Sequence, residues 1–186
     1  NAKLNNADNI EKTWNALKDS KSPRLQVRAA TSPVQIEYIF HKKPEAMLDA
    51  IKRTITECKA LCSDVEFIAE DATRSECAFL SEAIEAAINA GATVITLCDT
   101  AGAMLPSEFA KFIRDQYAAT PKLREVKLGV RCSNDIAMAD ACAVIAVAEG
   151  PFPDLRNALG DGDRGHMRVI IKRMVRDLVN GFAVDL

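Results

Sequence analysis

The sequence predicts an α/β fold in which parallel strands alternate with helices. Four short apolar or β-branched segments begin near residues 25, 65, 93 and 126, and each is followed by a segment with helical spacing. This interval suits a βαβ unit, which takes about 30 residues or more. The strand segments are apolar along their length, as buried parallel strands are. Right-handed crossovers then place all four helices on one side of the sheet, and polar residues gather at the carboxyl ends of the strands.

The chain is expected to begin with a helix over residues 10–17. Ile10, Trp14 and Leu17 are spaced to share one face of that helix. Either Asn9 or Asp8 is the expected N-cap, because both side chains accept hydrogen bonds from free backbone N–H groups.

The first strand-helix unit combines a strand over residues 24–30 with a helix over 44–62. Thr31-Ser32-Pro33 follows the strand, and Pro44 suits the first turn of the helix. The apolar residues of the helix recur at intervals of three and four: Met47, Ile51, Ile55, Cys58 and Cys62.

Three further units follow the same pattern. Their strands are expected at residues 65–69, 93–98 and 126–132, and their helices at residues 76–90, 108–118 and 136–149. Gly91 and Gly150 are typical helix stops, and Ser107 is the expected cap of the helix over 108–118.

The composition changes after Gly150 and divides the chain into two parts. Residues 1–150 are expected to form the βα domain, and residues 151–186 are expected to form a Gly/Pro loop followed by an amphipathic helix over 167–180. The apolar stripe of that helix consists of Met167, Ile170, Ile171, Met174, Val175, Leu178 and Val179. Packing on the body or on a partner is the favoured interpretation, and a membrane-surface helix is the alternative.

Composition and charge exclude several classes of function. The net charge of −2 and the 5% of aromatic residues speak against a nucleic-acid surface. No apolar run approaches the roughly 18 residues of a membrane span. Six scattered cysteines without a Cys-x-x-Cys spacing favour reduced thiols and a cytoplasmic location.

Acidic residues follow three neighbouring strands. Glu70 and Asp71 end one strand, Asp99 ends the next, and Asp135 follows the last. Carboxylates at the same ends of parallel strands converge on one pocket, where they can bind a metal, orient a substrate or move protons. In the alternative, these aspartates cap the following helices or bind Arg74.

The motifs that follow these strands resemble those of 2-isopropylmalate synthases and their relatives, including homocitrate synthases, over residues 9–150. They are the segment 65–76 (VEFIAEDATRSE), Asp99-Thr100-Ala101-Gly102, Asn134-Asp135 with Met138, and Ala30-Thr31-Ser32-Pro33 with Glu37-Tyr38. This family folds as a (β/α)8 TIM barrel, like 3-hydroxy-3-methylglutaryl-CoA lyase. The resemblance implies that the four strands match strands four to seven, hence a partial barrel. A complete barrel takes about 250 residues, more than the 186 of this chain.

The resemblance also implies a chemistry and its residues. The family transfers the acyl group of acetyl-CoA to a 2-oxo acid, in leucine biosynthesis for the synthase itself, with a divalent metal that polarises the keto group. Glu70 and Thr100 match residues that contact the 2-oxo acid.

The sequence departs from the family at the metal site. The family's strand-seven His-x-His pair is replaced by Arg131 and Ser133, and the strand-one motif with a metal-binding Asp and a catalytic Arg has no counterpart. Other pocket positions differ too: Gln26, Ile68, Thr96 and Cys98. We therefore expect no metal or other cofactor in this chain and assign no catalytic residue. The two histidines, His41 and His166, are expected at the surface.

Two functions remain open. The chain is either a synthase-type acyltransferase, incomplete or impaired as a catalyst on its own, or a catalytically silent module that binds a carboxylate or serves assembly. The expected substrate-binding residues are Glu70, Thr100 and Arg131, with Arg131 holding a carboxylate directly in place of the metal. Half a barrel leaves two open strand edges, which predicts a homo-oligomer.

Overall fold

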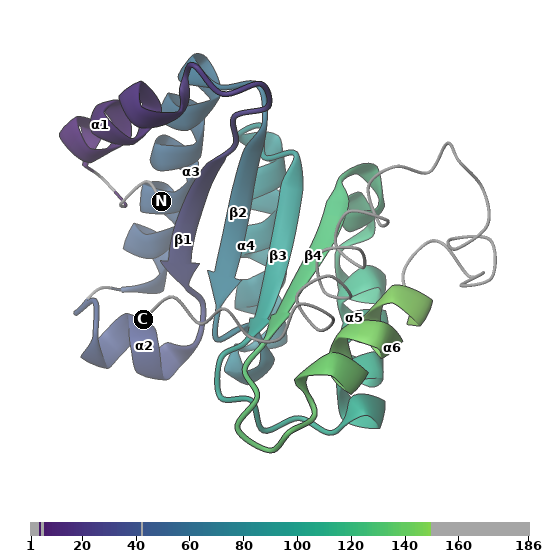
Figure 1. The fold of residues 1–186 in the computed structure, drawn as a ribbon. Helices are drawn as coiled ribbons and strands as arrows, with labels where there is room; N and C mark the ends of the chain where they lie inside the picture. The colour runs from purple at the N-terminus through teal and green to yellow at the C-terminus, as the bar shows by residue number, and fades with distance from the viewer. Residues whose placement is uncertain (1–3, 5, 42, 150–186) are drawn as a thin grey trace.

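The computed structural model describes residues 4, 6–41 and 43–149 and contains a single parallel sheet. The strands lie in chain order and are β1 (Leu25–Ala30), β2 (Val65–Glu70), β3 (Val94–Asp99) and β4 (Lys127–Cys132). The α-helices are α1 (Ala7–Leu17), α2 (Pro33–Tyr38), α3 (Pro44–Leu61), α4 (Cys77–Asn89), α5 (Pro106–Ala119) and α6 (Ala139–Glu149). Two 3-10 helices, η1 (Ala72–Arg74) and η2 (Pro121–Glu125), complete the described elements. The predicted parallel α/β fold is confirmed (Figure 1).

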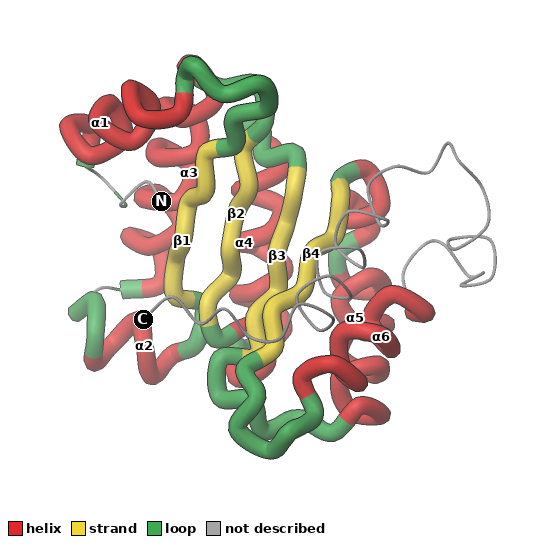
Figure 2. Tube along the Cα trace, in the orientation of Figure 1, coloured by secondary structure: helices red, strands yellow, loops and turns green. Residues whose placement is uncertain are grey.

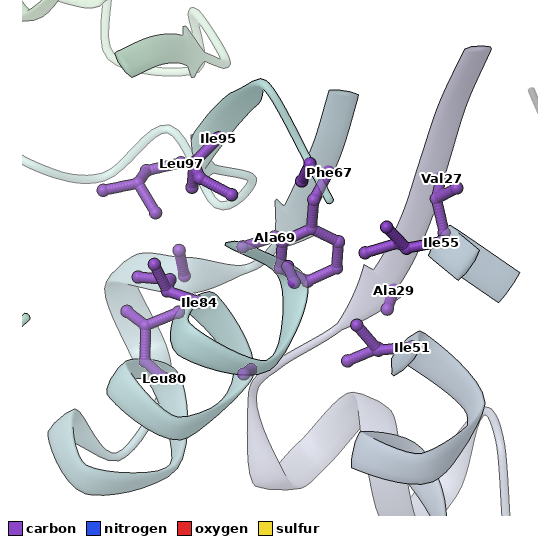
Figure 3. Close-up of a cluster of buried hydrophobic side chains, with 14 of the residues drawn as sticks. Val27, Ala29, Ile51, Ile55, Phe67, Ala69, Leu80, Ile84, Ile95 and Leu97 are labelled. Atoms are coloured by element: carbon purple, nitrogen blue, oxygen red, sulfur yellow. The ribbon is translucent and has the colours of Figure 1, made fainter. Parts of the chain in front are cut away.

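The helices cover one face of the sheet because every second strand residue is apolar and points toward them. Figure 1 shows α3 and α4 behind β1, β2 and β3. Phe67, at the middle of β2, is fully buried and lies between Ile55 of α3 and the side chains of Ile84 and Ile95 (Figure 3). Burial of such side chains contributes about 1.5–3 kcal/mol each, so this layer is the main source of stability.

The other face of the sheet carries polar side chains. They come from the alternate strand positions: Gln26, Arg28, Glu66, Glu70, Thr96 and Arg131. We call this surface the polar face. The described part of the chain places no helix in front of β1, β2 or β3 on this side (Figure 1).

Buried hydrogen bonds join the strands across the polar face. Glu66 is only 8% exposed, and its carboxylate accepts from Thr96 Oγ1 at 2.6 Å and from Gln26 Nε2 at 3.0 Å. A buried carboxylate needs such donors to offset the loss of water. The face is therefore an ordered polar layer that spans three strands.

Two predicted helix caps are wrong. Helix α1 begins at Ala7, and Asn6 rather than Asn9 or Asp8 caps it by accepting from the N–H of Asn9 at 2.9 Å. Helix α5 begins at Pro106, so Ser107 already lies inside its first turn. Proline at the first helical position fixes the start there because it has no N–H to satisfy.

Helix α2 was not predicted, although the sequence contains its start signal. Ser32 is its N-cap and Pro33 its first residue, and the Ser32 hydroxyl accepts from the N–H of Gln35 at 3.4 Å. With six residues, the helix is too short for a clear periodicity. It follows β1 at the carboxyl edge of the sheet (Figure 1).

The last described helix begins later than predicted. The backbone of Ala137 is in the left-handed region, with φ of 59°, which a right-handed helix does not allow. The helix therefore starts at Ala139 rather than at residue 136. Asn134 Oδ1 accepts from the N–H of Ala139 at 3.2 Å and thereby caps the helix. The predicted loop over 151–166 and helix over 167–180 lie outside the described residues. None of the described helices is long and apolar enough to cross a membrane.

Candidate functional site

A small polar cavity lies where the carboxyl ends of the strands meet the polar face. Its volume is about 60 Å³. The lining residues are Arg28, Glu70, Cys98, Asp99, Thr100, Arg131 and Ser133. The three predicted substrate-binding residues, Glu70, Thr100 and Arg131, thus come together from β2, the loop after β3, and β4. Figure 2 shows the loops that follow β3 and β4 at this end of the sheet.

Two arginines of this cavity approach the carboxylate of Glu70. Its Oε1 accepts from Arg28 Nε at 3.0 Å and from Arg28 Nη2, and it lies 3.7 Å from Arg131 Nη1. The Arg131 side chain is 62% exposed, whereas that of Glu70 is 20% exposed. Arg28 therefore neutralises Glu70 at close range. Arg131 makes only a long contact to it and keeps N–H donors for a ligand.

Sequence reasoning missed Arg28, although a signal was present. Gln26 and Arg28 are polar residues at alternate positions of β1, between buried residues such as Val27. Strict alternation in a strand indicates that one face lies against a polar environment. The expectation of strands that are apolar along their length does not hold for β1, whose alternate residues Gln26 and Arg28 are only partly buried.

A backbone N–H group that follows β2 holds Thr100 in place. Its Oγ1 accepts from the N–H of Asp71 at 2.9 Å. Because the oxygen is already used as an acceptor, the hydroxyl proton remains to donate to a ligand. Thr100 is thus a donor in the cavity, as a carboxylate-binding site requires.

Asp71 does not line the cavity. It is fully buried, and its backbone is in the left-handed region with φ of 60°. Its carboxylate accepts from Ser32 Oγ at 2.5 Å and from Arg74 Nε at 2.7 Å. The hydrogen bond to Asp71 also raises the pKa of Arg74. The alternative that this aspartate binds Arg74 is therefore the correct one, and its role is to join the loops after β1 and β2.

Asp99 lines the cavity, but its oxygens are already engaged. They accept from Thr73 Oγ1 at 3.1 Å and from the N–H groups of Gly102 and Met104, both at 3.2 Å. Asp135 is exposed and is not among the lining residues. Of the acidic residues expected to converge, only Glu70 and Asp99 meet in this cavity.

Gly102 brings the loops after β3 and β4 into close contact. It is left-handed, with φ of 60°, and a Cβ atom there would lie 2.7 Å from the carbonyl oxygen of Ser133 and 2.5 Å from Asp135 Oδ2. The N–H of Ser133 also donates to the carbonyl oxygen of Asp99 at 3.0 Å. The position of Ser133 at the cavity thus depends on the absence of a side chain at Gly102.

The donor set of the cavity does not fit a divalent cation. Arg131 has no lone pair to offer, and its fixed charge repels a cation. Among the described residues, no group of three or more His, Cys, Asp and Glu side chains is arranged to hold a metal ion. His41 is exposed, and His166 lies outside the described residues.

The cavity thiol is a poor nucleophile. Burial and the neighbouring Glu70 raise the pKa of Cys98 to about 12, against the opposing effect of Arg131 and Arg28. A thiol with this pKa is almost entirely protonated at neutral pH. The arrangement therefore suits the binding of an anion rather than covalent catalysis.

Comparison with solved structures shows the same fold. The hydroxymethylglutaryl-CoA lyase of Pseudomonas aeruginosa superimposes with a TM-score of 0.62 at 15% sequence identity, over 75% of this chain and 47% of the lyase. The predicted partial TIM barrel is confirmed by this match. The four-stranded sheet corresponds to about half of such a protein.

Comparison with known sequences shows the family. A 2-isopropylmalate synthase of Pelotomaculum thermopropionicum is 39% identical over 145 residues, which are 78% of this chain and 29% of the synthase. One of Aquifex aeolicus is 40% identical over 141 residues, 76% of this chain and 27% of the synthase. The chain thus spans about three tenths of the length of these relatives. The family model described as HMGL-like matches residues 4–152, and the chain therefore belongs to the HMGL-like family.

Proposed function

We propose that this chain is part of the barrel of a 2-isopropylmalate synthase-type protein and that its own site binds the carboxylate of a 2-oxo acid without a metal. The observation that carries the proposal is the cavity in which Arg131, Thr100 and the Arg28–Glu70 pair meet. In a protein of this type the second substrate is acetyl-CoA, and the pathway is leucine biosynthesis. The relatives named as synthases support this assignment.

Binding follows from the donors that remain free. The Arg131 guanidinium offers two parallel N–H groups, which match the two oxygens of a carboxylate. The Thr100 hydroxyl donates a further hydrogen bond from the neighbouring loop. The Arg28–Glu70 pair holds the floor of the cavity and keeps the Glu70 charge from repelling the ligand.

The same residues support the proposal that this chain is impaired as a catalyst. A guanidinium at position 131 and a hydroxyl at position 133 cannot supply the two imidazole ligands that the family uses for its metal. No step of the acyl transfer is assigned to residues of this chain. Its contribution is to bind and orient the acid.

Replacing Arg131 by alanine is expected to weaken the binding of a 2-oxo acid such as pyruvate about 10- to 100-fold. Hydrogen bonds to a charged group contribute about 1.5–3 kcal/mol, and 1.4 kcal/mol is tenfold in affinity. Calorimetry in the presence of a chelator measures the effect. Lys127→Ala is the matched control, because Lys127 is an exposed cation at the other end of the same strand. Equal affinities for Arg131→Ala and the unchanged chain would refute the proposed role.

The acyl-transfer alternative has its own measurement. The chain is incubated with acetyl-CoA, a 2-oxo acid and Mn²⁺ or Mg²⁺, and the free thiol of CoA is titrated over time. We expect no release above the background without protein. Release that requires both the 2-oxo acid and the metal would show a competent synthase and would contradict impairment.

Assembly is the second expected property. In the described part of the chain, β1 and β4 each pair with only one neighbouring strand. Open edges favour further pairing, so we predict a homodimer or larger assembly. Light scattering at micromolar concentration measures the mass. A strictly monomeric species would mean that the edges are covered within one chain.

A further inference from the structure

Two neighbouring helices on the apolar side of the sheet contain buried polar atoms that lack a hydrogen-bond partner. In the described part of the chain, these atoms are Ser81 Oγ in α4, Gln116 Oε1 in α5 and Thr120 Oγ1 directly after α5. Helices α4 and α5 pack against each other on the same face of the sheet (Figure 1). An unpaired buried polar group is unfavourable, so its presence on this one pair of helices needs a physical reason.

The Gln116 amide lies beside the thiol of Cys77, the first residue of α4. Gln116 is only 3% exposed, and its Nε2 donates to Cys77 Sγ at 3.9 Å. The carbonyl oxygen of the same amide, Oε1, has no partner among the described residues. The reduced thiol therefore satisfies the donor of this amide and leaves its acceptor unpaired.

Cys77 differs from the other five cysteines because it is exposed. The others are buried or half-buried: Cys58, Cys62, Cys98, Cys132 and Cys142. Burial raises the pKa of Cys58 to about 11 and the pKa values of Cys98 and Cys132 to about 12. At neutral pH such thiols are almost entirely protonated and react slowly. Cys77 is thus the cysteine that a small reagent in solution can reach.

We propose that Cys77 is a site of reversible oxidation by hydrogen peroxide and that the Gln116 amide holds the sulfenic acid formed there. The oxygen that is added to the sulfur carries a proton to donate and lone pairs that accept. The amide presents the matching groups, because Nε2 donates and Oε1 accepts. Oxidation therefore supplies an O–H donor for the unpaired Oε1, whereas the reduced state offers only a weak S–H donor. This proposal does not rest on the proposed function.

The first N–H groups of α4 add further donors near the sulfur. Glu76 is the N-cap residue, but its side chain makes no hydrogen bond to the helix backbone. These N–H groups have no partner within the helix, so they can donate to an oxygen on Cys77. Ser81 lies one turn after Cys77 on the same face of α4, and its Oγ is one of the unpartnered atoms. The added oxygen therefore enters surroundings that contain both donors and a free acceptor.

The oxidation requires no co-reactant besides the peroxide. The Cys77 thiol gives up its proton, and the sulfur attacks one oxygen of hydrogen peroxide. An S–O bond forms and the O–O bond breaks, and the second oxygen leaves as hydroxide, which takes the proton to form water. The sulfur loses two electrons, and the peroxide gains them.

Two molecules of glutathione reverse the oxidation. The first displaces water from the sulfenic acid and forms a mixed disulfide with Cys77. The second attacks this disulfide, releases the Cys77 thiol and leaves as oxidised glutathione.

Trapping with dimedone, which reacts with sulfenic acids, tests the proposal on the full chain. After brief exposure to hydrogen peroxide and its removal by catalase, we expect peptide mass spectrometry to find dimedone on Cys77 and on no other cysteine. Delayed addition of dimedone measures the lifetime of the sulfenic acid. Gln116→Leu should shorten this lifetime about 3- to 10-fold, the factor that corresponds to one hydrogen bond.

Two further variants accompany Gln116→Leu. Gln35→Leu is the matched control, because it removes a glutamine amide from a different helix, α2, and should leave the lifetime unchanged. Gln116→Asn keeps an amide but shortens the side chain, so it should also shorten the lifetime. Circular dichroism of each variant establishes that the fold is retained, and Gln116→Asn replaces Gln116→Leu if the latter does not fold.

Three outcomes would overturn the proposal. The first is the absence of dimedone on Cys77 of the unchanged chain, or equal labelling of Cys77 and the half-buried Cys132. The second is an equal lifetime in the folded Gln116 variant and the unchanged chain. The third is an oxidised Cys77 that glutathione does not return to the thiol.

Discussion

Replacing Asp71 by alanine is expected to lower the free energy of unfolding by about 2–4 kcal/mol. The substitution leaves the buried Ser32 hydroxyl without its acceptor and removes the acceptor of the Arg74 guanidinium. An unsatisfied buried group costs about 1–3 kcal/mol, and alanine in the left-handed region costs about 1 kcal/mol more than aspartate, which tolerates that conformation better. Urea denaturation followed by circular dichroism measures the loss.

Two matched variants isolate the cause. Asp71→Asn keeps an acceptor and tolerates the left-handed backbone, so it should lose clearly less stability than Asp71→Ala. Asp115→Ala removes an exposed carboxylate paired with Lys111 and should change stability by less than about 1 kcal/mol. If Asp71→Ala were as mild as Asp115→Ala, the joining role of Asp71 would be wrong.

Replacing Gly102 by alanine is expected to destabilise the chain by about 2–5 kcal/mol and to reduce carboxylate binding. A Cβ atom would meet the Ser133 carbonyl oxygen at 2.7 Å, and the backbone there is left-handed with φ of 60°. A left-handed alanine costs about 1–2 kcal/mol, and forced overpacking about 1–3 kcal/mol. Denaturation and calorimetry on the same sample measure both effects.

Two further variants separate the strain of the left-handed backbone from the steric overlap of the added Cβ atom. Gly102→Asn keeps the tolerance for the left-handed backbone but still introduces a Cβ atom, so it should remain strongly destabilising. Adding Asp135→Ala to Gly102→Ala removes the contact with Asp135 but not that with the Ser133 backbone, so recovery should be partial. Full recovery in Gly102→Asn would show that strain alone accounts for the loss.

The strands and long helices were predictable because their periodicities are strong. Helix α3 was expected over 44–62 and is found at Pro44–Leu61, since its apolar residues mark one face along five turns. Helix α2 has too few residues to show a period. The start of α6 depends on the left-handed backbone of Ala137, and no pattern of side chains in the sequence predicts that conformation.

The candidate site was predictable in part. Strand topology brings Glu70, Thr100 and Arg131 to one cavity, because residues at the carboxyl ends of parallel strands share an edge. Their role in substrate binding stays a prediction. The hydrogen bonds that withdraw Asp71 from the cavity depend on Ser32, 39 residues earlier in the chain, and such long-range pairing is not visible in a single sequence.

Under the proposed function, the position of Arg28 links association at the edge of the sheet to ligand binding in the cavity. Arg28 lies on β1, an outer strand of the described sheet, and at the same time lines the cavity and neutralises Glu70. A strand that paired with β1 would restrict the motion of this arginine, and a ligand in the cavity would restrict it as well. By thermodynamic linkage, a ligand that tightens association at β1 must itself bind more tightly to the associated form, by the same factor. The protein's affinity for its ligand is therefore expected to depend on protein concentration.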